Sequence, residues 1–115
     1  MVKKFNSFAP ELRENMRGGD GVVEVTSFVT AEELNNKGRL FGKIVLKPGC
    51  GIGHHVHEND SELFYIIKGV ATYDDNGTTV NLSAGDVTLT PAGTGHSIKN
   101  EGDEDVELIA LIVYA

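Results

Sequence analysis

Three histidines and one glutamate stand in the second half of the chain with a spacing that suits metal binding. His55 and His57 are two residues apart, and side chains two apart in a strand point to the same face. Glu62 follows after a polar segment, and His96 begins a later strand behind a glycine-rich turn. Three neutral imidazoles and one carboxylate suit a divalent transition metal. We therefore expect His55, His57, Glu62 and His96 to meet at one metal site.

The polar segment at residues 58–61 separates His57 from Glu62. We expect it to be a hairpin turn, because a hairpin places the start of one strand beside the end of its neighbour, within reach of both imidazoles. Four protein ligands leave two positions open on an octahedral ion, where water, substrate or dioxygen can bind. Manganese, iron, nickel, cobalt, copper and zinc all accept this donor set. His54 projects from the opposite face, toward solvent or an interface.

Short segments rich in β-branched residues follow one another through most of the chain, which is typical of strands. Asn76-Gly77 predicts a tight hairpin, because both residues accept the positive φ of a type I′ turn. Many short strands with almost no helix predict an antiparallel sandwich or barrel. The expected strands are residues 22–29, 40–46, 53–57, 63–73 with an interruption at Gly69, 78–82, 87–90, 96–99 and 106–114.

The N-terminal region is less regular, and we expect only short helical segments there. Pro10 can open a helical turn over residues 11–14, because proline is tolerated in the first turn of a helix. Thr30 and Glu33 have the spacing of a capping box, which predicts a short helix that ends before Gly38. The glycine-rich loop at residues 16–19 is a candidate to lie over a barrel mouth.

The composition excludes several classes of protein. The 115 residues are 40% hydrophobic and 23% charged, which is typical of one globular domain. We expect a single domain over residues 1–115, with its metal-binding core at about residues 40–114. A net charge of -7 without a basic patch argues against nucleic-acid binding. The chain has no phosphate-binding loop and no apolar run of the roughly 20 residues that cross a membrane.

Cys50 is the only cysteine, so the chain cannot form an intramolecular disulfide, which fits a reducing compartment. The N-terminus carries no apolar stretch of the kind found in secretory signals. The expected location is therefore cytoplasmic.

The last predicted strand, at residues 106–114, is apolar on both faces. A barrel of this size buries one face of such a strand, and the other face needs a cover of its own. We expect a homodimer that supplies this cover. The alternative is that the N-terminal segment of the same chain covers it.

Two motifs in the second half of the chain closely resemble those of the cupin superfamily. The first, G-x5-H-x-H-x4-E-x6-G, runs over residues 49–69, and the second, G-x5-P-x-G-x2-H-x3-N, runs over residues 85–100. Every fixed position of both motifs matches, and together they contain the four candidate ligands. In that family His55, His57, Glu62 and His96 would be the metal ligands.

The resemblance implies an all-β fold, an antiparallel double-stranded β-helix or jelly-roll barrel, here with a short N-terminal helical segment. It implies a metal site but not a reaction, because cupins host unrelated chemistries. One reading is a small metalloenzyme of dioxygenase, decarboxylase or isomerase type that acts on a small polar metabolite, such as a carboxylic acid or a sugar. The alternative is a metal-dependent module that binds or senses a small molecule without turnover.

A few other residues are candidates for a role at or near the site. Arg17 and Arg39 could anchor an anionic ligand, because a guanidinium binds a carboxylate through two parallel hydrogen bonds. Phe64 shares the inward face of Glu62 and is expected to fill the core. Cys50 is interpreted as a turn residue with a buried thiol, or as part of a thiol-processing site with a cysteine–tyrosine crosslink. Asn100 is expected to hold a turn through a side-chain hydrogen bond to the backbone.

Overall fold

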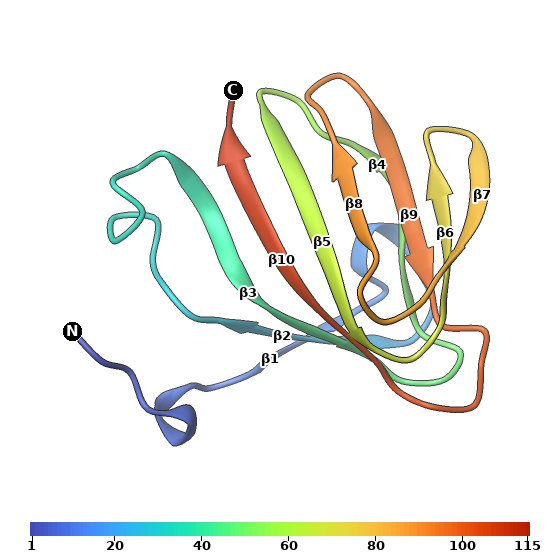
Figure 1. The fold of residues 1–115 in the computed structure, drawn as a ribbon, viewed down its shortest axis with the longest axis horizontal. Helices are drawn as coiled ribbons and strands as arrows, with labels where there is room; N and C mark the ends of the chain where they lie inside the picture. The colour runs from blue at the N-terminus through green and yellow to red at the C-terminus, as the bar shows by residue number, and fades with distance from the viewer.

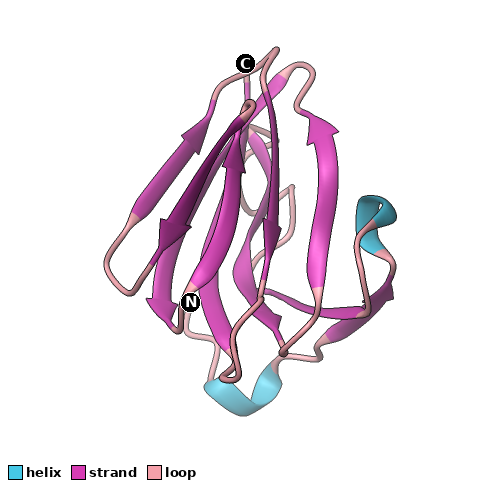
Figure 2. Cartoon of the chain, turned by 90° about the vertical axis from the view of Figure 1, so that its right-hand side faces the viewer, coloured by secondary structure: helices cyan, strands magenta, loops and turns pink.

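The structure is a computed structural model that describes all 115 residues, and its architecture is the predicted all-β, antiparallel one. The ten strands are β1 (Glu11–Glu14), β2 (Val22–Ser27), β3 (Gly38–Leu46), β4 (Gly51–Val56), β5 (Asp60–Lys68), β6 (Ala71–Asp75), β7 (Thr78–Leu82), β8 (Val87–Thr90), β9 (Gly95–Lys99) and β10 (Val106–Tyr114). The only helical elements are two 3-10 turns, η1 (Phe5–Ser7) and η2 (Met16–Gly18), which lie at the edges of the molecule (Figure 2). No helix is long and apolar enough to cross a bilayer.

The strands form two sheets that face each other and enclose one hydrophobic core, in the manner of a jelly roll (Figure 1). One sheet has six strands in the order β1-β2-β3-β10-β5-β8, and the other has four in the order β4-β9-β6-β7. Every neighbouring pair is antiparallel. The hairpin predicted at Asn76-Gly77 joins β6 to β7, and both residues have positive φ.

Alternation of buried and exposed side chains along the strands defines the core. In β5, Phe64 and Ile66 are 2% and 0% exposed, whereas Tyr65 between them is 48% exposed. This confirms the inward face predicted from Glu62, which is itself buried. The same alternation runs through β3 and β10, which pair along most of their length at the centre of the six-stranded sheet.

Residues 11–14 form strand β1, so the prediction of a helical turn after Pro10 was wrong. The segment pairs with β2 in the register Leu12↔Glu24 and Arg13↔Val23. A helix of four residues makes too few hydrogen bonds to offset the entropy cost of its nucleation. The edge of β2, by contrast, provides hydrogen-bond partners for the backbone of this segment. Long-range pairing therefore decides the structure of this segment.

The capping box at Thr30 forms, but the helix predicted after it does not. The Thr30 amide donates to the Glu33 carboxylate at 2.9 Å, and the Glu33 amide donates to the Thr30 hydroxyl at 3.1 Å. Asn35 and Asn36 then adopt left-handed conformations with φ of 56° and 55°. Two consecutive left-handed residues stop a right-handed helix, so the segment remains a series of turns.

The connection from His57 to Glu62 is not a hairpin, contrary to the prediction, because β4 and β5 belong to different sheets. The chain crosses the open end of the barrel between them. Glu62 consequently faces the histidines across the interior instead of beside them in one sheet. The segment at Gly69 makes a similar crossing, from β5 to β6.

Candidate metal centre

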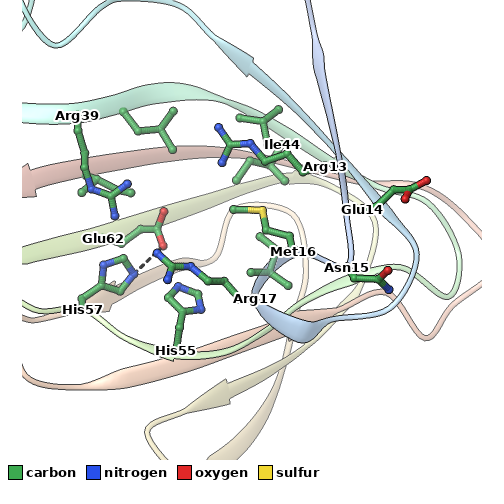
Figure 3. A pocket seen from close by; sticks show the side chains of 14 residues that line it. Arg13, Glu14, Asn15, Met16, Arg17, Arg39, Ile44, His55, His57 and Glu62 are labelled. Carbon is green, nitrogen blue, oxygen red and sulfur yellow. Dashed lines mark hydrogen bonds and ion pairs between the residues drawn. The ribbon is translucent and has the colours of Figure 1, made fainter.

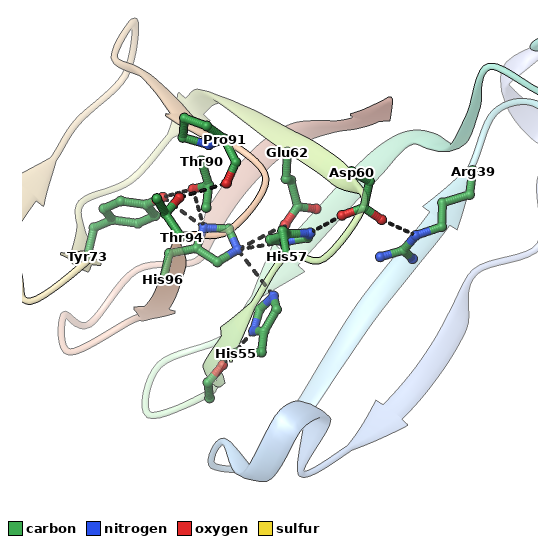
Figure 4. A network of polar contacts seen from close by, with 11 residues as sticks. Arg39, His55, His57, Asp60, Glu62, Tyr73, Thr90, Pro91, Thr94 and His96 are labelled. Atoms are coloured by element: carbon green, nitrogen blue, oxygen red, sulfur yellow. Dashed lines mark hydrogen bonds and ion pairs between the residues drawn. The ribbon is translucent and has the colours of Figure 1, made fainter. Parts of the chain in front are cut away.

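The four residues singled out by their spacing meet inside the barrel (Figure 4). Their candidate ligand atoms all lie within 4.8 Å of one another. Nε2 of His96 lies 3.1 Å from Nε2 of His57 and 3.2 Å from Nε2 of His55. The Glu62 carboxylate oxygen lies 3.0 Å from His57 and 3.1 Å from His96. Three nitrogens and one oxygen therefore point at one small volume.

Both sheets contribute to this cluster. His55 on β4 and His96 on β9 are direct partners in the four-stranded sheet, and Glu62 comes from β5 of the other sheet. A bulge in β4 makes this pairing possible, because Ile52 pairs with Ile98 while His55 pairs with His96. The extra residue turns both Ile52 and His55 inward, which strict alternation would not allow.

Two of the histidines are held by acceptors that fix their ring orientation. Nδ1 of His55 lies 2.8 Å from the Gly53 carbonyl, and Nδ1 of His57 lies 2.7 Å from the Asp60 carboxylate. A carbonyl or an ionised carboxylate only accepts hydrogen bonds, so each Nδ1 carries the hydrogen. In the neutral ring, Nε2 then offers a lone pair to the centre of the cluster. Partners of this kind orient metal-binding histidines in general.

His96 is the most enclosed member, with 1% of its surface exposed. Its Nδ1 lies 2.7 Å from the Tyr73 hydroxyl and 2.9 Å from the Thr90 hydroxyl, and these hydroxyls are themselves 2.9 Å apart. The Phe64 ring stacks on its imidazole with centroids 5.2 Å apart. The ring is thus fixed both by hydrogen bonds and by packing.

The charges around the cluster shift the pKa values of its members in different directions. The hydrogen bond that the protonated His57 ring donates to Glu62 raises the pKa of His57, whereas burial lowers the pKa of His55. Burial opposes ionisation of Glu62, but its hydrogen bonds with the histidines outweigh this and hold its pKa below the usual range. Burial likewise opposes ionisation of Asp60, but Arg39 at 2.9 Å helps hold the pKa of this carboxyl down.

This donor set fits a divalent cation. With the Nδ1 hydrogens of His55 and His57 directed outward, the Nε2 lone pairs and the Glu62 carboxylate converge without enough hydrogens to bridge them. The lone pairs of these atoms repel one another, and a cation at the centre of the cluster would attract all of them. A metal bonded at about 2.1 Å to neighbouring ligands requires them to be about 3 Å apart, which matches the observed spacing.

A cavity of about 370 Å³ opens beside the cluster (Figure 3). His55, His57 and Glu62 lie on its floor, and its apolar walls include Ile44 and Ile52. The other lining residues are Arg13, Glu14, Asn15, Met16, Arg17, Val25, Arg39, Leu40 and Ile112. Met16 and Arg17 of η2 therefore border the cavity. A ligand that enters here reaches the exposed side of His55.

The other residues singled out from the sequence lie outside the cavity. His54 is exposed on the outer side of β4, and Cys50 does not line the cavity. Asn100 is fully buried and donates to the backbone carbonyls of Leu46 and Glu104 at 2.8 and 2.7 Å, which confirms its role in holding a turn.

Sequence reasoning missed several residues that support the cluster or line the cavity beside it. Asp60 carried a weak signal, since it follows His57 by three residues in a polar segment. Tyr73 and Arg13 carried none, because only the packing of distant strands and the course of β1 bring them to the site. Arg39 was foreseen as a candidate anchor, but it is also tied to Asp60.

The motif spacing and this geometry can be compared with known proteins. The domain family described as "Cupin domain" matches residues 42–114. The chain belongs to the cupin family. An oxalate-binding protein from Thermotoga maritima is 42% identical to this cupin over 113 residues, which span 98% of this chain and 93% of that protein.

Solved structures have the same fold. The crystal structure of a predicted oxalate decarboxylase from Thermotoga maritima superposes on this cupin with a TM-score of 0.96, at 42% identity and with complete coverage of both chains. The cupin domain of Cnp3 from Schizosaccharomyces pombe has a TM-score of 0.74 at 21% identity, covering 91% of this chain and 69% of that one. At that identity, the second similarity concerns the fold alone.

Proposed function

We propose that His55, His57, Glu62 and His96 bind one divalent transition metal, and that the metal-loaded protein binds a small carboxylic acid of the oxalate type in the adjoining cavity. The observation that carries this proposal is the meeting of three imidazoles and one carboxylate beside a cavity that His55, His57 and Glu62 help to line. The oxalate-binding relative supports the class of ligand. A bound metal would supply a Lewis acid with open positions for carboxylate oxygens.

Binding without turnover accounts best for the residues around the cavity. A decarboxylase, an isomerase or a dioxygenase that moves protons needs an acid or base within reach of the substrate. Apart from Glu62, the only carboxylate that lines the cavity belongs to Glu14, and its side chain is directed away from the histidines (Figure 3). Turnover by a small metalloenzyme is the competing hypothesis.

Metal analysis and calorimetry test the proposal together. Protein purified without an affinity tag is expected to contain about one metal per chain, and oxalate is expected to bind it saturably. The chelated protein is expected to bind oxalate far more weakly. Incubation with oxalate, followed by measurement of formate and carbon dioxide, separates binding from decarboxylation. Absence of metal, or oxalate binding that survives chelation unchanged, would contradict the proposed site.

We further propose that two copies of this cupin pair through the outer face of the six-stranded sheet. Two rows of side chains cross β3, β10, β5 and β8 on this face. In strand order, the first row is Phe41, Leu111, Leu63 and Leu89, and the second row is Lys43, Ile109, Tyr65 and Val87. Lys43 is the only charged member, and Glu107 neutralises it at 2.8 Å. Two identical apolar faces can therefore meet without like charges opposing each other, despite the net charge of -7.

The cytoplasmic location also remains a proposal. The support for it is Cys50, which is the only thiol of the chain and is half-buried and free. A free thiol persists most easily in a reducing compartment. Localisation of the tagged full chain by cell fractionation tests this.

A further inference from the structure

All the arginines of this acidic protein gather at one place. The chain has 10 basic residues, and the three arginines among them, Arg13, Arg17 and Arg39, all line the cavity beside the candidate metal centre. No lysine lines it. Guanidinium groups suit the planar, two-oxygen geometry of a carboxylate better than ammonium groups do. This distribution indicates that the cavity is built to receive an anion.

Among these arginines, Arg17 alone has no side-chain partner within the chain. Arg13 is engaged by the Glu11 carboxylate through two contacts of 3.2 Å, and Arg39 is engaged by Asp60 at 2.9 Å. The Arg17 guanidinium forms no hydrogen bond or ion pair within the chain. Its side chain runs from η2 into the cavity, toward the end of Glu62 and the rings of His55 and His57 (Figure 3).

The backbone that carries Arg17 is held firmly against the barrel. Arg17 has a left-handed conformation with φ of 54°, which is unfavourable for a residue with a side chain and is found at ligand clamps. Gly53 of β4 lies so close to the Arg17 carbonyl that a Cβ at this position would collide with it. The Gly51 amide also donates to the Asp20 carbonyl at 2.9 Å. These contacts fix the origin of the arginine side chain.

We infer that Arg17 is the residue that selects dicarboxylates over monocarboxylates, by binding the carboxylate that is directed away from the candidate metal centre. This inference rests on the proposed function, in which the cavity takes a small carboxylic acid. One carboxylate of the ligand lies at the floor of the cavity, and the second pairs with the free guanidinium of η2. A monocarboxylate lacks the second carboxylate that would pair with the Arg17 guanidinium.

Calorimetry on the metal-loaded protein with oxalate and with acetate tests the inference. Arg17→Gln is expected to weaken oxalate binding by roughly 10- to 100-fold, the usual effect of losing a hydrogen bond to a charged group, and to change acetate binding by less than about 3-fold. Arg17→Lys keeps the charge without the two-pronged geometry, so an intermediate loss is expected. Lys37→Gln removes the same charge from an exposed site outside the cavity and is expected to leave both affinities unchanged.

The outcomes separate this inference from the proposal beneath it. If the wild-type protein binds neither oxalate nor acetate, both fail. If the wild-type protein binds oxalate and Arg17→Gln binds it equally well, only the role of Arg17 is overturned. Equal losses for oxalate and acetate would also overturn it, because Arg17 would then not act on the second carboxylate. Metal content and melting temperature are measured for each variant, and Arg17→Lys carries the comparison if Arg17→Gln does not fold.

Discussion

The inner face of the four-stranded sheet and the outer face of the six-stranded sheet depart from the usual burial pattern in opposite ways. Inside, His96 is 1% exposed and His57, at the end of β4, is 3% exposed, although both are polar. Outside, Tyr65, Val87 and Leu89 are 48%, 63% and 56% exposed, although all are large and mainly apolar. Each departure costs free energy in the isolated chain.

The difference between the two regions indicates that each would be stabilised by a different kind of partner. A cation would offset the free-energy cost of burying a polar cluster, because it binds lone pairs that water cannot reach. Contact with another apolar surface would stabilise an exposed apolar face, because it removes that face from water. The inner region should therefore respond to metal and pH, and the outer region to protein concentration. Five experiments test this distinction.

Loss of His96 is expected to have the largest effect. His96→Ala removes one candidate metal ligand and leaves the Tyr73 and Thr90 hydroxyls without their shared partner. Metal content should fall to near zero, and the melting temperature of the metal-treated protein should approach that of the chelated protein, because a metal stabilises only the state that binds it. Elemental analysis and thermal melts measure this. The matched control, His54→Ala, alters an exposed ring and should retain full metal.

A fall in pH from 7 to 5 is expected to release the metal. Protons compete for the imidazoles, so affinity should fall by at least about tenfold per pH unit below the usual histidine pKa of about 6.5. Competition titrations with a chelator at each pH give the affinity. An affinity that is constant over this range would show that the histidines do not hold the metal.

The chelated protein should depend on pH much less, because two histidines oppose each other. The raised pKa of His57 contributes stability below about pH 6.5, and this is lost as pH rises through the higher pKa of the folded state. The lowered pKa of His55 contributes stability above about pH 6.5, and this is lost as pH falls toward its lower folded pKa. Melts of chelated and metal-loaded protein over the same range should therefore diverge; parallel curves would contradict the assignment.

Asp60→Asn is expected to weaken metal binding by roughly tenfold to a hundredfold, the usual effect of altering a residue that orients a metal-binding histidine. The substitution keeps the size of the side chain, but removes the charge that His57 and Arg39 share. Asp103→Asn, in the exposed turn before β10, is the charge-matched control. Equal affinities in the two variants, measured by chelator competition, would show that Asp60 does not orient the site.

The smallest expected effect on the metal centre comes from a change in the outer face. Leu89→Lys places a charge among the exposed apolar rows and should weaken the proposed dimer by about tenfold or more, with metal content unchanged. Sedimentation at several concentrations measures the association. Thr79→Lys, on the exposed strand β7, should leave it intact. A wild-type protein that remains a 12.4 kDa monomer at all concentrations would contradict pairing through this face.

Strand periodicity and motif spacing predicted the all-β fold, the inward face of β5 and the grouping of His55 with His57 correctly. These are local properties, because the face on which a side chain lies depends on its distance along one strand. Predictions that depended on distant pairing were less successful. Residues 11–14 joined a sheet edge instead of forming a helix, and the connection before Glu62 crossed between sheets instead of turning back within one.

The sequence by itself determined which side chains have the chemistry to meet at one point, since the four candidate metal ligands stand at fixed positions of two motifs. Only the tertiary structure decided how that point is supported and what can reach it. Tyr73, Asp60 and Arg17 come to the site from separate strands and loops, and their positions depend on the pairing and packing of segments far apart in the chain. Such contacts are set by the packing of the whole core, which no local spacing encodes.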